Sequence, residues 1–194
     1  MGILNALHLI QLVEKYQGLV EKVLAVRQDW SEKNPDVLKA LVRAHSRAAG
    51  FIEQPENRAE VASILAQPER IGVDADVIRR TFDGRLKISP DGTIRESSRY
   101  LLVGREEATR PDPVQAAWLY AQMVRWGQAA LSAEALKTAM SVFRPDLYNA
   151  AVGQDGKPAE PSEAIGAFAG PAFDAGDIQG HLRAFAIGHW KPKA

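Results

Sequence analysis

The side chains best able to do chemistry in this chain are scattered along it. The four histidines are His8, His45, His181 and His189. No two of them have metal-ligand spacing with a carboxylate nearby, so the pattern favours ordinary surface or core histidines over a metal site. The chain has no cysteine, which excludes disulfides, thiolate metal ligands and cysteine nucleophiles.

One stretch, AAWLYAQMVRWGQ (116–128), combines aromatic rings with a cation. Trp118, Arg125 and Trp126 are the right residue types for a stacking or cation–π site. Such a helix more often packs its tryptophan faces into a core, and that interpretation is favoured here.

Carboxylate pairs and a glycine-rich run provide two further candidates. Glu106 with Glu107, and Glu160 with Glu163, fall in loop-like sequence, where solvated carboxylates are the usual outcome. The run GAFAGPAFDAG (166–176) lacks both the Lys-Ser/Thr ending and the preceding strand of a phosphate loop. No serine elbow and no nucleophile–base pair is evident. We therefore predict a protein that is not an enzyme and has no catalytic, metal or cofactor site.

Composition sets the broad class. The chain has 194 residues, of which 46% are hydrophobic and 25% are charged, with a formal net charge of zero. This length is sufficient for one domain with a core. The balanced charge does not favour nucleic acid or an anionic membrane surface as a partner.

The opening residues are apolar, and we expect a helix over 3–17 that needs burial on most sides. Asn5, His8 and Gln11 interrupt the apolar run, and Glu14 ends it too early for a membrane span. The run also lacks the basic start and the cleavage site of a secretory signal. As written, the sequence predicts a cytoplasmic protein.

The stretch EKVLAVRQDW (21–30) predicts the most convincing strand. Its residues Val23–Val26 form a short apolar run with charges on both sides, the pattern of a strand buried on both faces of a parallel sheet. We expect this strand over 21–28. RLKIS (85–89) predicts a weaker strand, and SPDGT (89–93) predicts a turn.

The rest of the chain reads mainly as helices, whose starts are marked by capping residues and prolines. These markers are Ser31 with Pro35, Pro55, Asp74, Asp112 with Pro113, Ser132, Pro145 and Asp177. Gly84, Gly127 and Gly153 follow predicted helix ends, and Gly50 permits a break. Many helices and almost no sheet indicate the helical flank of an α/β protein whose sheet lies elsewhere.

Five segments in this order resemble the nitrate- and bicarbonate-type solute-binding proteins of ABC transporters. They are EKVLAVRQDWSEKNPDVLKALVRA (21–44), PENRAEVASILAQPERIGVDADVI (55–78), AAWLYAQMVRWGQ (116–128), FRPDLYNAAV (143–152) and FDAGDIQGHLRAFAI (173–187). The resemblance runs from about Glu21 to Ile187. Cytoplasmic nitrate sensors share the same fold and much of the pattern.

The resemblance implies a helix-rich α/β chain, the C-terminal part of a two-lobed periplasmic-binding-protein-like fold with most of the sheet missing. Residues 1–20 form an apolar N-terminal helix that does not match the family, and residues 21–194 form the C-terminal portion of the solute-binding domain. Val20 and Ala175 stand where the family has proline, and His181 stands where tyrosine is common.

By the same resemblance, Lys22 contacts a small oxyanion such as nitrate, nitrite or bicarbonate at the cleft between the lobes. Lysine suits this task because its ammonium is a compact charge that tolerates several anion orientations; the alternative is a solvated lysine beside a strand. The implied function is part of the substrate-binding component of an ABC transporter, with a permease as partner. If the chain is a truncated transport receptor, its location is periplasmic.

The alternative is a cytoplasmic nitrate-sensing regulator that binds a response-regulator or antiterminator partner. Two further possibilities remain. One is an enzyme of thiamine-precursor synthesis, for which the residues offer no catalytic constellation. The other is a homodimer formed through residues 3–17.

Overall fold

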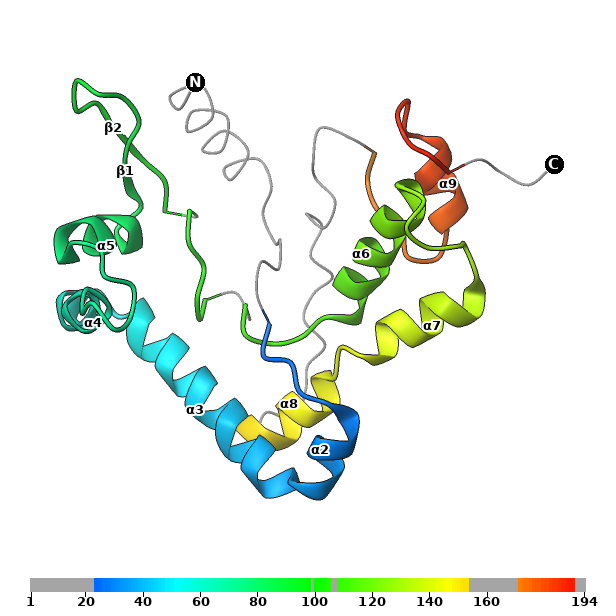
Figure 1. Ribbon diagram of the computed structural model, residues 1–194, viewed down its shortest axis with the longest axis horizontal. Coiled ribbons are helices and arrows are strands. Elements are labelled where there is room, and N and C mark those ends of the chain that lie inside the picture. Colours follow the sequence, from blue (N-terminus) through cyan, green and yellow to red (C-terminus); the bar gives the residue numbers. More distant parts are fainter. Residues whose placement is uncertain (1–22, 99, 106–107, 154–170, 191–194) are drawn as a thin grey trace. The chain divides into compact units, whose positions relative to one another are not determined.

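The computed structural model describes residues 23–98, 100–105, 108–153 and 171–190, and helices dominate these ranges (Figure 1). The described residues divide into two compact units, one within residues 43–109 and the other within residues 23–42 and 110–190. The described residues contain one two-stranded sheet. The helix-rich fold class with little sheet is therefore confirmed.

The predicted strand over 21–28 is wrong in its described part. Residues 23–27 form no strand, and helix α2 begins directly after them as Gln28–Lys33. Arg27 is nonetheless extended, with φ −69° and ψ 145°. A strand exists only when a neighbour accepts its backbone hydrogen bonds, and no described residue pairs with this segment. Ser31 is also not a cap, because it lies inside α2 and its hydroxyl donates to the Gln28 carbonyl over 2.7 Å.

Helix α3 (Pro35–Glu53) starts at a proline, which is well suited to a first helical turn. It continues through Gly50, so the break permitted there does not occur. The division between the two units falls within this helix, after Val42. Leu38 and Ala49 are buried, whereas several apolar residues elsewhere on the helix are exposed.

In the first unit, a short 3₁₀ turn η1 (Pro55–Asn57) leads into α4 (Arg58–Leu65), which packs against α5 (Ala75–Phe82). Val61, Ala62 and Ile78 are buried. Arg58 and Asp83 form a half-buried ion pair at 2.9 Å. The predicted cap of α5 is confirmed, since the Asp74 carboxylate accepts from the Asp76 amide over 2.8 Å.

The weaker predicted strand is the one that forms. β1 (Arg85–Lys87) pairs antiparallel with β2 (Ile94–Glu96) in a hairpin that extends from α5 (Figure 1). The predicted turn is confirmed, because Gly92 has φ 93° and its amide donates to the Ser89 carbonyl. Gly84 has φ 67°, and the Ser97 amide donates to its carbonyl over 2.9 Å. A Cβ on Gly84 would overlap the Ser97 backbone, so only glycine fits this hairpin base.

The second unit contains α6 (Pro113–Arg125), α7 (Ala133–Ser141), α8 (Pro145–Val152) and α9 (Ile178–Arg183). The predicted caps Asp112, Ser132 and Asp177 each accept from a backbone amide of the following helix. The core of this unit contains Tyr120, Ala121, Val124, Ile178 and Leu182.

The Tyr120 hydroxyl fixes the loop between α6 and α7. It donates to the Ala130 carbonyl over 2.6 Å and accepts from the Ser132 amide over 2.9 Å. Among the described helices, none is long and apolar enough to cross a membrane.

Candidate functional site

The predicted oxyanion contact, Lys22, lies outside the described residues, as do residues 3–17 and the carboxylates Glu106, Glu107, Glu160 and Glu163. The described chain begins at the next residue, Val23. The environment that can be described for a ligand contact at Lys22 is therefore the segment that follows it.

Residues 23–27 present apolar side chains to solvent. Val23 is 60% exposed, Leu24 48% and Val26 42%. Arg27 and Asp29 pair through two hydrogen bonds of 2.9 and 3.2 Å, and this contact lowers the pKa of Asp29. Three of the five residues in this segment expose an apolar side chain, and a folded protein usually covers such a group of apolar side chains. The composition of a buried strand is present, but the described residues do not supply the sheet that would bury it.

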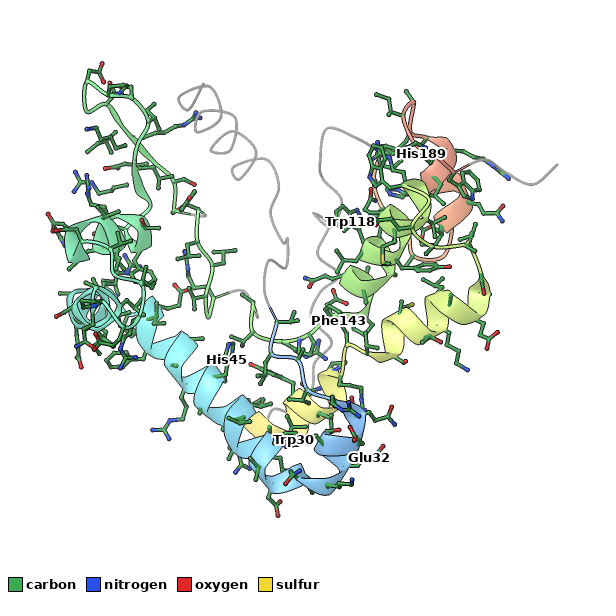
Figure 2. All side chains as sticks on the ribbon, viewed as in Figure 1. Trp30, Glu32, His45, Trp118, Phe143 and His189 are labelled. Carbon is green, nitrogen blue, oxygen red and sulfur yellow. The ribbon has the colours of Figure 1, made fainter. Side chains whose placement is uncertain are left out.

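A cation–π arrangement, the less favoured interpretation of this stretch, is present at the C-terminal end of α6. The Arg125 guanidinium carbon lies 4.7 Å from the centroid of the Trp126 ring and 3.7 Å from that of Phe185. Trp126 is 45% exposed, so it does not pack into a core as favoured above. Trp118 projects from the same helix and is half-buried (Figure 2).

Arg125 is, however, already engaged by the chain itself. Its Nε donates to the Ile187 carbonyl over 2.9 Å, and its own carbonyl accepts the amides of His189 and Trp190 at 2.7 and 3.1 Å. The guanidinium and the backbone carbonyl of Arg125 together hold residues 185–190 at the end of α6 (Figure 2, near His189). This arrangement gives Arg125 a structural role in holding the segment that follows α9.

His181 is a core histidine, with a residue exposure of 5%. Its Nδ1 lies 3.1 Å from the Ala172 carbonyl, and the rings of Phe173 and Phe185 meet it edge-on, each at 4.9 Å. Burial lowers the pKa of His181, the Ala172 hydrogen bond partly opposes this effect, and the charge of Arg125 lowers the pKa further. No cluster of metal-ligand residues occurs in the part of the chain that the structure describes.

The most organised polar cluster was not anticipated from the sequence. One Glu53 carboxylate oxygen, Oε1, accepts the successive amides of Val103, Gly104 and Arg105 at 2.8, 2.9 and 3.4 Å. The other oxygen, Oε2, lies 2.8 Å from Arg105 Nε. Successive backbone amides around one anion form a nest. Because its occupant is a residue of the same chain, this nest anchors a loop to the end of α3.

The position of this loop also explains why residue 104 is a glycine. A Cβ on this residue would lie 2.8 Å from the carbonyl carbon and oxygen of Ala49, so the loop approaches the backbone of α3 closely. The only signal in the sequence is a glycine in an irregular stretch, and that signal does not reveal a carboxylate about fifty residues earlier in the chain.

The chain is similar to one family model and to several known proteins. Residues 13–66 match the NMT1-like family. The chain is 31% identical over 144 residues to the nitrate import ATP-binding protein NrtC of Synechococcus elongatus, covering 74% of this chain and 21% of that protein. It is 28% identical over 167 residues to the nitrate/nitrite binding protein NrtA of the same organism, covering 84% of this chain and 38% of NrtA.

The fold of the chain also resembles that of a solved solute-binding protein. The crystal structure of the periplasmic nitrate-binding protein NrtA from Synechocystis PCC 6803 matches with a TM-score of 0.71 at 24% identity, covering 84% of this chain and 44% of NrtA. The chain therefore spans less than half the length of the relatives it matches. In sequence and in fold, this protein is related to a part of the nitrate- and bicarbonate-type solute-binding proteins.

Proposed function

We propose that this chain is part of the substrate-binding component of an ABC transporter for nitrate or a similar small oxyanion. The observation that carries the proposal is the similarity, over most of this chain, to proteins named for binding nitrate, nitrite or bicarbonate. The mechanism would be capture of the anion between two lobes followed by hinge closure. This chain would supply a portion of that fold.

The names of the relatives favour transport over regulation. Three of the matched proteins are named as ATP-binding proteins of nitrate import or bicarbonate transport. A segment related to this chain therefore occurs both in binding proteins and in proteins named for the ATP-binding step. The expected partner is accordingly a transporter component such as the permease. A periplasmic location for the ligand site follows the name of the matched NrtA.

Lys22 is our candidate for the anion contact. It directly precedes the exposed apolar segment 23–26. Burial of this segment as a strand of a sheet would bring the lysine to that sheet's edge. A lysine at a partly desolvated edge interacts strongly with a small oxyanion, because its charge is less screened there than in bulk water.

The test measures thermal unfolding of the full chain mixed with the complementary portion of NrtA from Synechocystis. Sodium nitrate is compared with sodium chloride at equal ionic strength. A ligand at about 100 times its Kd stabilises a protein by about 2.7 kcal/mol, which is a shift of several degrees at this chain length. We expect a nitrate-dependent rise in Tm that Lys22→Ala abolishes.

Lys33→Ala is the matched control, because Lys33 is an exposed lysine in the last turn of α2. We expect this variant to keep the full nitrate response. If nitrate, nitrite and bicarbonate all leave the Tm of the mixture unchanged relative to chloride, the proposed function is wrong. If the response survives in Lys22→Ala, the function stands and the assignment of Lys22 is wrong.

A further inference from the structure

A series of hydrogen bonds joins α6 to α9, which pack against each other in the second unit (Figure 1). Arg125 Nη1 donates to Gln122 Oε1 over 3.4 Å, and Gln122 Nε2 lies 3.5 Å from His181 Nε2. On the other side of the ring, His181 Nδ1 lies 3.1 Å from the Ala172 carbonyl oxygen. The two bonds of Gln122 are long, so their direction matters more here than their strength.

The direction of each bond follows from the groups that it joins. A guanidinium only donates hydrogen bonds, so the oxygen of the Gln122 amide faces Arg125. The nitrogen of the same amide then faces His181, and this nitrogen also only donates. The Ala172 carbonyl only accepts, so the imidazole proton is on Nδ1. When these bonds are all made, His181 is therefore neutral and its Nε2 is an acceptor.

A second proton on His181 is incompatible with this series of bonds. The new Nε2–H group would point at the NH2 group of Gln122, and two donors form no hydrogen bond. Turning the amide over would give His181 the oxygen, but it would present the NH2 group to Arg125, which also only donates. In either arrangement one partly buried donor loses its partner, which destabilises the charged form.

The surroundings of the His181 ring do not compensate for the added charge. Burial lowers the pKa of His181 most, the Ala172 hydrogen bond opposes this effect, and the positive charge of Arg125 lowers the pKa further. The rings of Phe173 and Phe185, which carry no charge, meet the imidazole edge-on. The other charged or titratable groups of the described segments around it are exposed: Glu134, Lys137, Asp174, Asp177, Arg183 and His189.

Arg125 connects this histidine to residues 185–190. Its guanidinium carbon lies 3.7 Å from the centroid of the Phe185 ring, and its Nε donates to the Ile187 carbonyl over 2.9 Å. The same Phe185 ring lies 4.9 Å from the His181 ring. A protonated His181 would therefore share one aromatic ring with the guanidinium and repel it. Movement of the guanidinium would weaken its contacts with Phe185 and Ile187.

From this geometry we propose that His181, Gln122 and Arg125 form a pH-sensitive switch, in which neutral His181 holds residues 185–190 at the end of α6 and protonated His181 releases them. Release would uncover the Arg125 carbonyl, which accepts the amides of His189 and Trp190 in the held form. Because the fold favours the neutral ring, holding is complete above about pH 6.5 and declines as the pH falls from there. This proposal does not depend on the oxyanion function, since it uses no residue of that site.

The test measures amide hydrogen exchange by NMR in the full chain between about pH 8 and about pH 5. Each measured rate is divided by the rate of an unfolded amide at the same pH, which gives a protection factor. We expect the protection factors of His189 and Trp190 to fall roughly fivefold in acid, as for the loss of one hydrogen bond. Circular dichroism over the same range should show that the helices stay folded.

Gln122→Glu should reverse the switch. A carboxylate only accepts, so it would take a hydrogen bond from Arg125 and another from protonated His181. We expect this variant to keep the protection of His189 and Trp190 in acid. Gln179→Glu is the matched control, because it makes the same charge change at an exposed position on α9. It should lose protection in acid as the parent chain does.

Three results would overturn the proposal. One is protection of the His189 and Trp190 amides that does not change with pH in the parent chain. Another is a loss of the helical circular dichroism signal in step with the loss of protection, because acid would then unfold the helices instead of releasing one segment. The third is the same acid response in Gln122→Glu and Gln179→Glu. None of these results bears on nitrate binding by the mixture described above.

Discussion

The Glu53 carboxylate and the Gly104 amide, fifty-one residues apart, form a hydrogen bond of 2.9 Å that joins a loop to the end of α3. The same oxygen accepts the two neighbouring amides, and the Glu53 side chain is only 11% exposed. A carboxylate at the C-terminal end of a helix is normally unfavourable, because the helix dipole is negative there. The three amides and Arg105 offset this effect.

Removing this acceptor should destabilise the first unit. Glu53→Ala leaves three amide donors without their partner, and an unsatisfied buried polar group costs about 1–3 kcal/mol. Glu53→Gln keeps an oxygen for the amides and loses only the charge, so we expect a smaller loss of stability. Urea denaturation of both variants measures the difference, and an equal loss would show that the amide bonds contribute nothing beyond the charge.

Protonation of Glu53 at low pH should destabilise the fold as the Glu53→Gln substitution does. Burial alone would raise the pKa of Glu53, but the three amides and Arg105 together lower it below its ordinary value of 4.5. A carboxyl with a lowered folded-state pKa stabilises the fold above its unfolded pKa and loses this contribution as the pH falls through the folded value. We expect the Tm to fall below about pH 4.5 in the parent chain and to fall less in Glu53→Gln.

Gly104 and Gly50 should respond in opposite directions to alanine. A Cβ on Gly104 meets the Ala49 backbone at 2.8 Å, and forcing such a contact costs about 1–3 kcal/mol. Gly50 lies inside α3 with nothing within 4 Å of an added Cβ, and alanine in a helix interior is more stable than glycine by about 0.5–1 kcal/mol. Thermal unfolding of the two variants tests both signs, and destabilisation by Gly50→Ala would contradict the helix through that residue.

His181 should make the second unit sensitive to mild acid. Its pKa in the folded chain is lowered below 6.5, chiefly by burial, so the fold favours the neutral ring. The stabilisation is complete above about pH 6.5 and is lost as the pH falls from there through the folded-state pKa. Scanning calorimetry across this window should show a falling Tm that flattens in His181→Gln. His45→Gln, an exposed histidine on α3, should leave the slope unchanged.

Replacing the Arg125 clamp should loosen the segment after α9. Arg125→Lys keeps the charge but loses the Nε–H bond to Ile187 and the planar contact with Phe185. We expect amide exchange at His189 and Trp190 to accelerate roughly fivefold, which corresponds to about 1 kcal/mol for one hydrogen bond. The control is Arg183→Lys on α9, where the guanidinium bonds, among the described residues, to Gln179 one turn earlier. Equal amide exchange rates at His189 and Trp190 in the two variants would show that the Arg125 side chain does not hold this segment.

Local signals predicted the helices well. Asp74, Asp112, Ser132 and Asp177 all cap the helices expected of them, because a cap forms between a side chain and an amide two or three residues away. The SPDGT turn and the weaker strand succeeded for the same reason, since a hairpin pairs neighbouring segments. The resemblance to solute-binding proteins was likewise confirmed by the relatives and by the fold.

The cap expected at Ser31 and the break permitted at Gly50 failed locally, since both residues lie inside helices. The larger failures concern partners that are distant in the sequence. Val23–Val26 has the composition of a buried strand, yet it stays exposed and unpaired within the described residues, because a strand is defined by its neighbours. Trp126 was expected in a core and instead lies exposed beside Arg125. The amide nest around Glu53 was not expected at all.

The sequence by itself therefore determined most of the helix starts, the hairpin and the resemblance to the solute-binding proteins, since each depends on neighbouring residues or on an ordered series of segments. Only the tertiary structure decided that Glu53 holds the loop at Gly104 and that Arg125 clamps residues 185–190. It also revealed which face of α3 stays exposed. The physical reason is distance along the chain: backbone amides and apolar faces are the same chemical groups at every position, and only folding selects their partners.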